Sequence, residues 1–184
     1  MAKLNKRKKG YTDMRQAKKF MYDRVKYSND EQFLKIVAMK NPYTDLKELA
    51  IPKIHDQKFL YEFILKTKSS WLRQRAARNI TETFIKKKIL NNLNNFDESL
   101  FMTFLEEIKD DQELLYRCLR HCTEPRIFKE AIPYFKKRKL LIKLKKDIEK
   151  GIKAKELPWG IKRIFESIDE RFEEIPASMD FILD

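Results

Sequence analysis

Two cysteines and a histidine lie within five residues of one another, a pattern that raises the question of a metal site. Cys118 and Cys122 are four residues apart and would share one face of a helix, with His121 beside them. A tetrahedral zinc site needs a further ligand, but the sequence contains only one other histidine, His55, and no third cysteine. Both thiols continue the apolar stripe of the same predicted helix. We therefore expect small core residues, no metal and no cofactor.

Acid-base or nucleophilic chemistry has one candidate pair, His55 with Asp56. No serine or cysteine is placed by the sequence to complete a nucleophilic set with this pair. Asp56 precedes an apolar helical pattern, where a carboxylate caps the first turn. The three glycines of the chain build no phosphate-binding loop. The sequence predicts a protein that is not an enzyme and takes no small-molecule substrate.

Basic residues with an adjacent tryptophan form the third chemical pattern. Arginines follow the tryptophan on one predicted helix, lysines occupy the next, and a cluster of four cations comes later. Such cations either pair with neighbouring acids or bind a partner, and the tryptophan either packs between repeats or stacks on a base. The candidate partner-binding residues are Trp71, Arg73, Arg75, Arg78, Lys86, Lys87, Lys136, Lys137, Arg138 and Lys139.

These candidates lie on a sequence that repeats every 26 to 28 residues between positions 30 and 144. A small residue recurs near the middle of each repeated window, and a large apolar residue closes it. The small positions are Ala50, Ala76, Thr103 and Ala131, and the closing positions are Ile54, Ile80, Ile108 and Phe135. A period of this length indicates stacked supersecondary units, each of which buries its apolar face against its neighbours.

A second helix is predicted to follow each window, and an aspartate marks its start. Asp30, Asp56 and Asp111 each precede apolar residues at helical spacing. An aspartate at this place accepts backbone N–H bonds and interacts favourably with the positive end of the helix dipole. The repeat is therefore a pair of short helices.

This pattern resembles the short form of the HEAT-like repeat family. The first helix is best represented by Leu72-Arg73 with Ala76-Ala77 and Ile80, and the acidic-glutamine turn by Asp56-Gln57 and Asp111-Gln112. The resemblance implies an all-α, right-handed α-solenoid of about four to five helix pairs with capping helices at both ends, and a concave surface that binds another macromolecule. Two turns depart from the family pattern, at residues 81–83 and 136–139.

HEAT-like DNA glycosylases for alkylated bases are one enzyme class built on this architecture. They place aromatic residues and a carboxylate on a basic concave face. In this chain the candidates for the same roles would be Trp71, Glu82 and Trp159. No stretch of the chain matches the active-site pattern of that family beyond the general repeat. The prediction of a noncatalytic protein therefore stands.

Composition agrees with helices throughout and places the charge unevenly. The 184 residues include three Gly and six Pro, 38% are charged, and the formal net charge is +13. Residues 1–27 contain ten Lys or Arg against two acids and residues 135–163 twelve against three, whereas residues 169–184 contain six acids and one Arg. Two basic segments would attract an acidic partner in a salt-dependent manner. No apolar run is long enough to span a membrane, and the first residues lack the apolar core of a signal peptide, so we expect a cytoplasmic protein without membrane attachment.

The predicted organisation is a basic arm over residues 1–11, one helical-repeat domain over 12–174 and an acidic, apolar tail over 175–184. Within the domain, the repeat core covers about 30–144 and a C-terminal cap covers 157–174. The helix after the arm should pack on the first repeat through Met14, Ala17, Met21 and Val25. The tail contains Phe181-Ile182-Leu183 and is expected to dock, either on a groove of this protein or on a partner.

Two functions from different classes remain open. One is a scaffold that binds a protein through its concave surface, and the other is a module that binds RNA or DNA through a basic face and the N-terminal arm. If the cations converge on one surface, nucleic acid is favoured. If acids are interspersed with them, a protein partner is favoured. We prefer the scaffold that binds a protein.

Overall fold

The computed structural model describes residues 16–92, 97–122, 124–153 and 160–176. Helices and short turns account for these residues, and none of them forms a strand, which confirms the predicted all-α class. The chain divides into two compact units, residues 1–81 and 82–184. Each unit is described by itself below. The predicted arm and most of the predicted tail lie outside the described residues.

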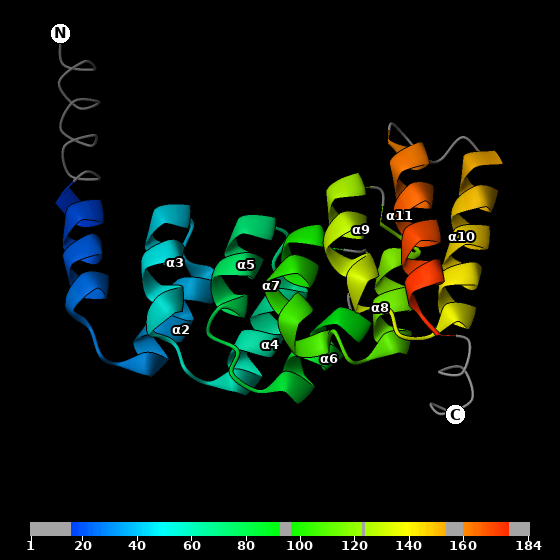
Figure 1. Ribbon diagram of the computed structural model, residues 1–184. Helices are drawn as coiled ribbons and strands as arrows, with labels where there is room; N and C mark the ends of the chain where they lie inside the picture. The colour runs from blue at the N-terminus through cyan, green and yellow to red at the C-terminus, as the bar shows by residue number, and fades with distance from the viewer. Residues whose placement is uncertain (1–15, 93–96, 123, 154–159, 177–184) are drawn as a thin grey trace, which may run out of the picture. The chain divides into compact units, whose positions relative to one another are not determined.

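The first unit is built from short helices that pack in consecutive pairs (Figure 1). Residues 16–27 are helical. After them come α2 (Glu31–Lys40), α3 (Thr44–Ala50) with the 3-10 turn η1 (Ile51–Lys53), α4 (Gln57–Lys66) and α5 (Ser70–Ala77). α2 contacts α3, α4 contacts α5, and α3 also contacts α5. The predicted succession of helix pairs is therefore present in this unit.

Side-chain caps explain where these helices begin. The Asp30 carboxylate accepts N–H bonds from Gln32 and Phe33, the first turn of α2. The Asp56 carboxylate accepts the N–H of Phe59 in α4. Each cap satisfies backbone donors that have no partner inside the helix. The starts predicted from the two aspartates are confirmed.

The small residues of the repeat are buried where the paired helices meet. Ala50 and Ala76 have no solvent-accessible surface, and the residues that close their windows, Ile54 and Ile80, are also buried. A larger side chain at either alanine would have to displace its neighbours in a close-packed interior. The recurrence of alanine is therefore a packing requirement.

The helix of residues 16–27 is attached to this unit through Val25 and Lys53. Val25 is fully buried. The Lys53 ammonium, in η1, donates to the carbonyls of Val25 (3.2 Å), Lys26 and Ser28 (3.1 Å). A cation at this place satisfies C-terminal carbonyls that lack helical partners and favours the negative end of the helix dipole. The predicted packing face is confirmed only in part, because Ala17 is exposed and Met21 half-buried, and Met14 lies outside the described residues.

The second unit is also built from helices that pack in consecutive pairs. Its elements are α6 (Thr83–Asn92), α7 (Glu98–Ile108), α8 (Gln112–Leu119), α9 (Pro125–Ala131) with the turn η2 (Ile132–Tyr134), α10 (Arg138–Lys153) and α11 (Ile161–Glu174). Each of the pairs α6–α7, α8–α9 and α10–α11 packs together. Contacts also join α6 to α8, α8 to α10, α7 to α9 and α9 to α11. Within this unit the helices therefore form two rows, one of which contains α6, α8 and α10.

Two glutamines connect successive helix pairs by the same hydrogen bonds. Gln57 Oε1 accepts the N–H of Thr81 at 2.9 Å, and its Nε2 donates to the carbonyl of Asn79 at 3.0 Å. Gln112 Oε1 accepts the N–H of Lys136 at 2.7 Å, and its Nε2 donates to the carbonyl of Tyr134 at 3.1 Å. Each glutamine is the first residue of its helix. It therefore satisfies backbone groups of the next turn along the chain, including the two turns whose sequences depart from the family pattern.

The start of α11 depends on a glycine. Gly160 has φ +98°, a left-handed conformation that side chains rarely adopt. A Cβ at this position would lie 2.8 Å from Cγ of Pro125, the first residue of α9. Gly160 therefore permits the close approach of α11 to α9. Residues 157–159, the first residues of the predicted C-terminal cap, lie outside the described residues.

Candidate interaction surfaces

Lys86 and Lys87 form ion pairs with acids of the same unit. Lys86 is 9% exposed, its ammonium is bound to the carboxylate of Glu107, and it lies 5.8 Å from the ring centroid of Phe104. Lys87 Nζ lies 2.9 Å from Oδ2 of Asp111, the residue that caps α8. Both lysines were candidates for a basic patch. The structure places Lys86 inside the fold and gives Lys87 a connecting role.

The ionisation of Asp111 reflects this arrangement. Burial by itself would raise the pKa of Asp111, but the bonds from the Lys87 ammonium and the Leu114 N–H hold that pKa below its usual value. A charged Asp111 is therefore favoured in the folded protein, and it caps α8 and binds Lys87 at the same time.

Four cations at the start of α10 were predicted to form a second patch. Lys136 Nζ lies 2.5 Å from Oδ1 of Asp110, and this bond lowers the pKa of Asp110. The Arg138 guanidinium stacks 3.9 Å from the ring centroid of Phe172 in α11. Lys137 and Lys139 also have interaction partners within the fold. Within the second unit, cations and acids are thus interspersed.

Trp71, Arg75 and Arg78 form the part of the predicted site that lies along one side of α5. Their spacing of four and three residues places them on one side of α5 and its C-terminal turn. Trp71 is 55% exposed, so it is not enclosed between repeats. Arg78 is exposed, and Arg75 is half-buried. We call these three residues the α5 stripe.

Arg73 differs from the α5 stripe. It is half-buried, and its Nη1 donates to the carbonyl of Thr67 at 3.1 Å, the residue that follows α4. The carbonyl of Thr67 is one of the C-terminal groups for which α4 has no internal donor. Arg73 therefore connects α5 to α4 and is not grouped with the other two arginines.

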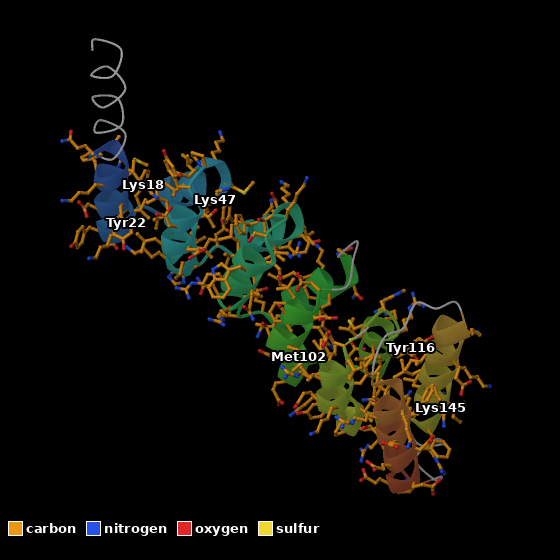
Figure 2. All side chains as sticks on the ribbon, turned by 90° about the horizontal axis from the view of Figure 1, so that it is seen from above. Lys18, Tyr22, Lys47, Met102, Tyr116 and Lys145 are labelled. Carbon is orange, nitrogen blue, oxygen red and sulfur yellow. The ribbon has the colours of Figure 1, made fainter. Side chains whose placement is uncertain are left out.

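Exposed aromatic side chains on the helix of residues 16–27 were not identified from the sequence. Phe20 is 68% exposed, Tyr27 is 73% exposed, and Tyr22 is exposed as well. Basic residues alternate with them: Lys19, Arg24 and Lys26. Figure 2 shows Tyr22 and Lys18 on this helix, and Lys18 pairs with Asp45 of α3 at 2.9 Å. The seven-residue spacing of Phe20 and Tyr27 could have indicated these side chains, because it places both residues outside the expected core face.

The two units differ strongly in charge. Residues 1–81 contain 20 Lys or Arg and 8 acids, whereas residues 82–184 contain 21 and 20. Nearly all of the net charge of +13 is therefore in the first unit. Electrostatic attraction of a polyanion would act on that unit, and the second unit is close to neutral.

A groove with apolar and acidic lining lies between α7 and α9 in the second unit. It has a volume of about 380 Å³ and is lined by Glu98, Met102, Glu124, Arg126, Ile127 and Glu130. Met102 is partly exposed here (Figure 2). Burial raises the pKa of Glu98, and the charges of Glu124 and Asp97 add to this effect. The rim of this groove is thus deficient in positive charge.

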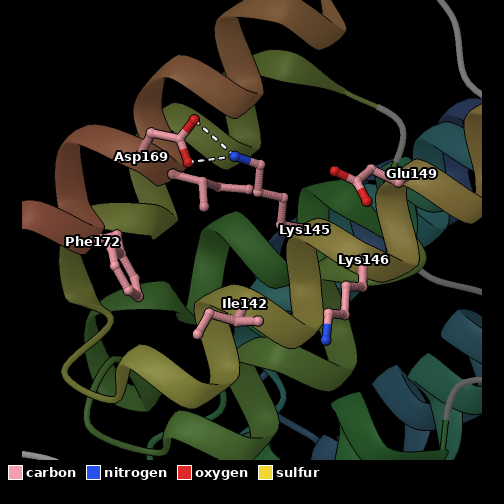
Figure 3. Close-up of a pocket in the computed structure, with 7 residues that line it drawn as sticks. Ile142, Lys145, Lys146, Glu149, Asp169 and Phe172 are labelled. Carbon is pink, nitrogen blue, oxygen red and sulfur yellow. Dashed lines mark hydrogen bonds and ion pairs between the residues drawn. The ribbon is translucent and has the colours of Figure 1, made fainter.

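A second groove lies between α10 and α11. Its volume is about 290 Å³, and the lining residues are Ile142, Lys145, Lys146, Glu149, Ile168, Asp169 and Phe172 (Figure 3). Lys145 Nζ is bound to both carboxylate oxygens of Asp169, at 2.5 and 2.8 Å, across the two helices. Ile142 is 43% exposed. Neither groove was predicted, because each depends on how two helices pack against one another.

The two thiols are buried in the second unit. Cys118 and Cys122 are free, and burial raises the pKa of each thiol to about 12. His121 is exposed, and its Nε2 accepts a hydrogen bond from Arg120 at 2.9 Å. Among the residues that the structure describes, no three His, Cys, Asp or Glu side chains are grouped as metal ligands. In the same ranges, no helix has the length and apolar character needed to cross a membrane.

Comparisons with protein-family models, curated proteins and solved structures gave no match to this chain. The resemblance to HEAT-like repeats therefore rests on the residues quoted above.

Proposed function

We propose that this protein is a noncatalytic helical-repeat scaffold that binds another protein. In this proposal the helix pairs stack as a right-handed α-solenoid of HEAT-like units, and the partner binds the concave surface. The contacts that join each helix to the next helix of its row in the second unit support the stacking. The hydrogen bonds of Gln57 and Gln112, which recur at equivalent positions, support the repeat.

The observation that carries the choice of a protein partner is the pairing of cations with acids in the second unit. Lys86, Lys87 and Lys136 each have a carboxylate partner on a neighbouring element. A lysine that is already neutralised by an acid adds little to phosphate binding. Apolar surface is left accessible between α7 and α9 at Met102, which is 39% exposed and lines the groove together with three glutamates and one arginine. A partner segment with apolar and basic side chains fits this groove by charge complementarity.

A direct experiment uses the full-length protein with one groove variant. Met102→Glu adds a further negative charge to the α7–α9 groove, and Lys66→Glu changes an exposed residue of α4 in the other unit as a control. Proteins captured from nuclease-treated extract are compared by quantitative mass spectrometry, and the affinity of each candidate is then measured with purified components. We expect at least one partner whose affinity falls about tenfold or more with Met102→Glu and is unchanged with Lys66→Glu. The proposal would be contradicted if no protein were captured from the nuclease-treated extract, or if no captured protein lost affinity with Met102→Glu.

Nucleic-acid binding is the second candidate function, because the first unit combines exposed aromatic side chains with positive charge. Exposed Phe20, Tyr22 and Tyr27 alternate with basic side chains, and this unit carries nearly all of the net charge. Aromatic side chains in a basic environment can stack on unpaired bases. Titration of the full-length protein with single-stranded RNA over a salt series tests this function, with Phe20→Ala as the variant. A steep salt dependence together with a loss of affinity in Phe20→Ala is the outcome expected for RNA binding.

A further inference from the structure

The groove between α10 and α11, two helices of the second unit, leaves apolar side chains accessible to solvent. Ile142 of α10 is 43% exposed, and Phe172 of α11 is half-buried beside it in the lining. Figure 3 shows Ile142 and Phe172 on facing sides of the groove. Apolar side chains at such a place gain free energy when a further apolar group covers them.

The charges around this groove are not all matched. Lys145 is bound to Asp169, as described above. Lys146 and the acid Glu149 also lie in the lining and are exposed, and Lys146 has no hydrogen-bond or ion-pair partner among the described residues. α10 as a whole contains seven Lys or Arg against two acids. An occupant with apolar side chains and a carboxylate near Lys146 would therefore complement this basic helix better than a basic occupant would.

The sequence that follows α11 has this composition and is within reach. Residues 177–184 contain Phe181-Ile182-Leu183 between Asp180 and Asp184. Phe172 lies two residues before the end of α11, which is about 3 Å along the helix axis at 1.5 Å per residue. Phe181 is the fifth residue after Pro176, and these five steps along the chain span up to about 18 Å when extended. The chain can therefore turn back from the end of α11 to the groove.

We infer that residues 180–184 of this chain dock in the groove between its own α10 and α11. Phe181 lies against Ile142 and Phe172, and a neighbouring aspartate pairs with Lys146. Docking covers an apolar run of three residues that would otherwise face water, and it neutralises one cation of α10. This inference does not depend on the identity of any partner, so it can fail or succeed independently of the proposed scaffold function.

Disulfide trapping in the full-length chain tests the docking. The native thiols Cys118 and Cys122 are buried with pKa values of about 12, so cysteines introduced at the surface will react first. The test variant carries Lys146→Cys and Ile182→Cys, which leaves Phe181, Ile142 and Phe172 intact. The control carries Lys162→Cys with Ile182→Cys. Lys162 is exposed in the first turn of α11, about 18 Å along the axis from the end of the helix, a distance that the extended tail also reaches.

The expected result is an intrachain disulfide between positions 146 and 182 that forms about tenfold or more faster than the one between positions 162 and 182, because docking raises the effective concentration. Adding Phe181→Asp to the test variant should reduce its rate to that of the control. Equal rates in the two variants would overturn the inference. Covalent dimers as the main product would also overturn it, since they would show the tail of a second copy in the groove.

Hydrogen exchange provides a second readout that needs no cysteine. In the full-length wild-type protein, amides of residues 180–184 should exchange about tenfold or more slowly than in a peptide of the same sequence. Ile142→Asp changes an exposed position, so the helices should be retained, as circular dichroism can verify, while the protection of residues 180–184 is lost. Unprotected amides in the wild type, or protection that persists in Ile142→Asp, would contradict docking in this groove.

Discussion

Lys35 Nζ, on α2, lies 2.6 Å from Oδ2 of Asp56, the carboxylate that caps α4, the first helix of the next pair. Lys87 makes the equivalent bond to Asp111 at the start of α8, at 2.9 Å. Each lysine is the fifth residue of its helix, and each aspartate also accepts an N–H bond in the helix that it begins. In each case one carboxylate therefore determines a helix start and holds it against the corresponding helix of the previous pair, α2 for α4 and α6 for α8.

Removal of the Asp111 carboxylate should destabilise the second unit through both of its roles. We expect Asp111→Ala to lower the free energy of unfolding by about 1 to 2 kcal/mol, the usual range for loss of an N-cap. Asp111→Asn keeps a capping oxygen and loses only the charge, so it should cost about half as much or less. Urea denaturation monitored by circular dichroism measures both. Equal losses in the two variants would show that the cap contributes nothing.

Acidification should weaken the first unit through Glu31 and Asp56. The pKa of Glu31 is lowered mainly by the N–H of Asp56, and the pKa of Asp56 is lowered mainly by the bond from Lys35. Because a lowered pKa in the folded state favours the charged form there, the resulting stability is complete above about pH 5. It is lost as the pH falls through about 4 toward the lowered values.

The check is the urea midpoint of the wild type and Asp56→Asn between pH 7 and pH 3. The midpoint of Asp56→Asn should fall less than that of the wild type over this range. Asp23→Asn, an exposed carboxylate without a partner among the described residues, serves as the control and should follow the wild type. An Asp56→Asn profile parallel to that of the wild type would contradict the assignment.

Charge reversal should separate Arg73 from Arg78, although both were predicted to bind a partner. Arg73→Glu removes the donor to the Thr67 carbonyl and should lower the free energy of unfolding by about 1 kcal/mol. Arg78→Glu changes an exposed side chain and should stay within about 0.5 kcal/mol of the wild type. Thermal denaturation of the two variants distinguishes them. A larger loss in Arg78→Glu would contradict the placement of the α5 stripe at the surface.

The thiols of Cys118 and Cys122 should be unreactive in the folded protein. Burial raises both pKa values to about 12, so almost no thiolate is present at pH 8. Titration with a chromophoric disulfide reagent should modify neither thiol under native conditions and both in urea. Reaction of one thiol in the native protein at the rate of free cysteine would show that it is accessible.

Local patterns in the sequence were sufficient for the helices and several of their starts. Asp30, Asp56 and Asp111 cap helices as expected, because an N-cap depends on residues within three positions along the chain. The repeat predicted the buried alanines at positions 50, 76 and 131, whereas the packing face predicted for the helix of residues 16–27 is confirmed only in part. The roles of Gln57 and Gln112 were missed, because their partners lie more than 20 residues away.

The sequence by itself determined the all-α class, the helix pairs and the excess of positive charge, since these follow from composition and from short-range spacing. Only the tertiary structure decided which cations are already neutralised and where apolar surface remains open. Lys86 is identical in type to its neighbours Lys87 and Lys88, yet it is buried because Glu107, 21 residues away, supplies its counter-charge. The groove of Ile142 and Phe172 likewise exists only because α10 and α11 pack together. Contacts between residues distant in sequence decide burial and charge pairing, and composition or periodicity does not contain them.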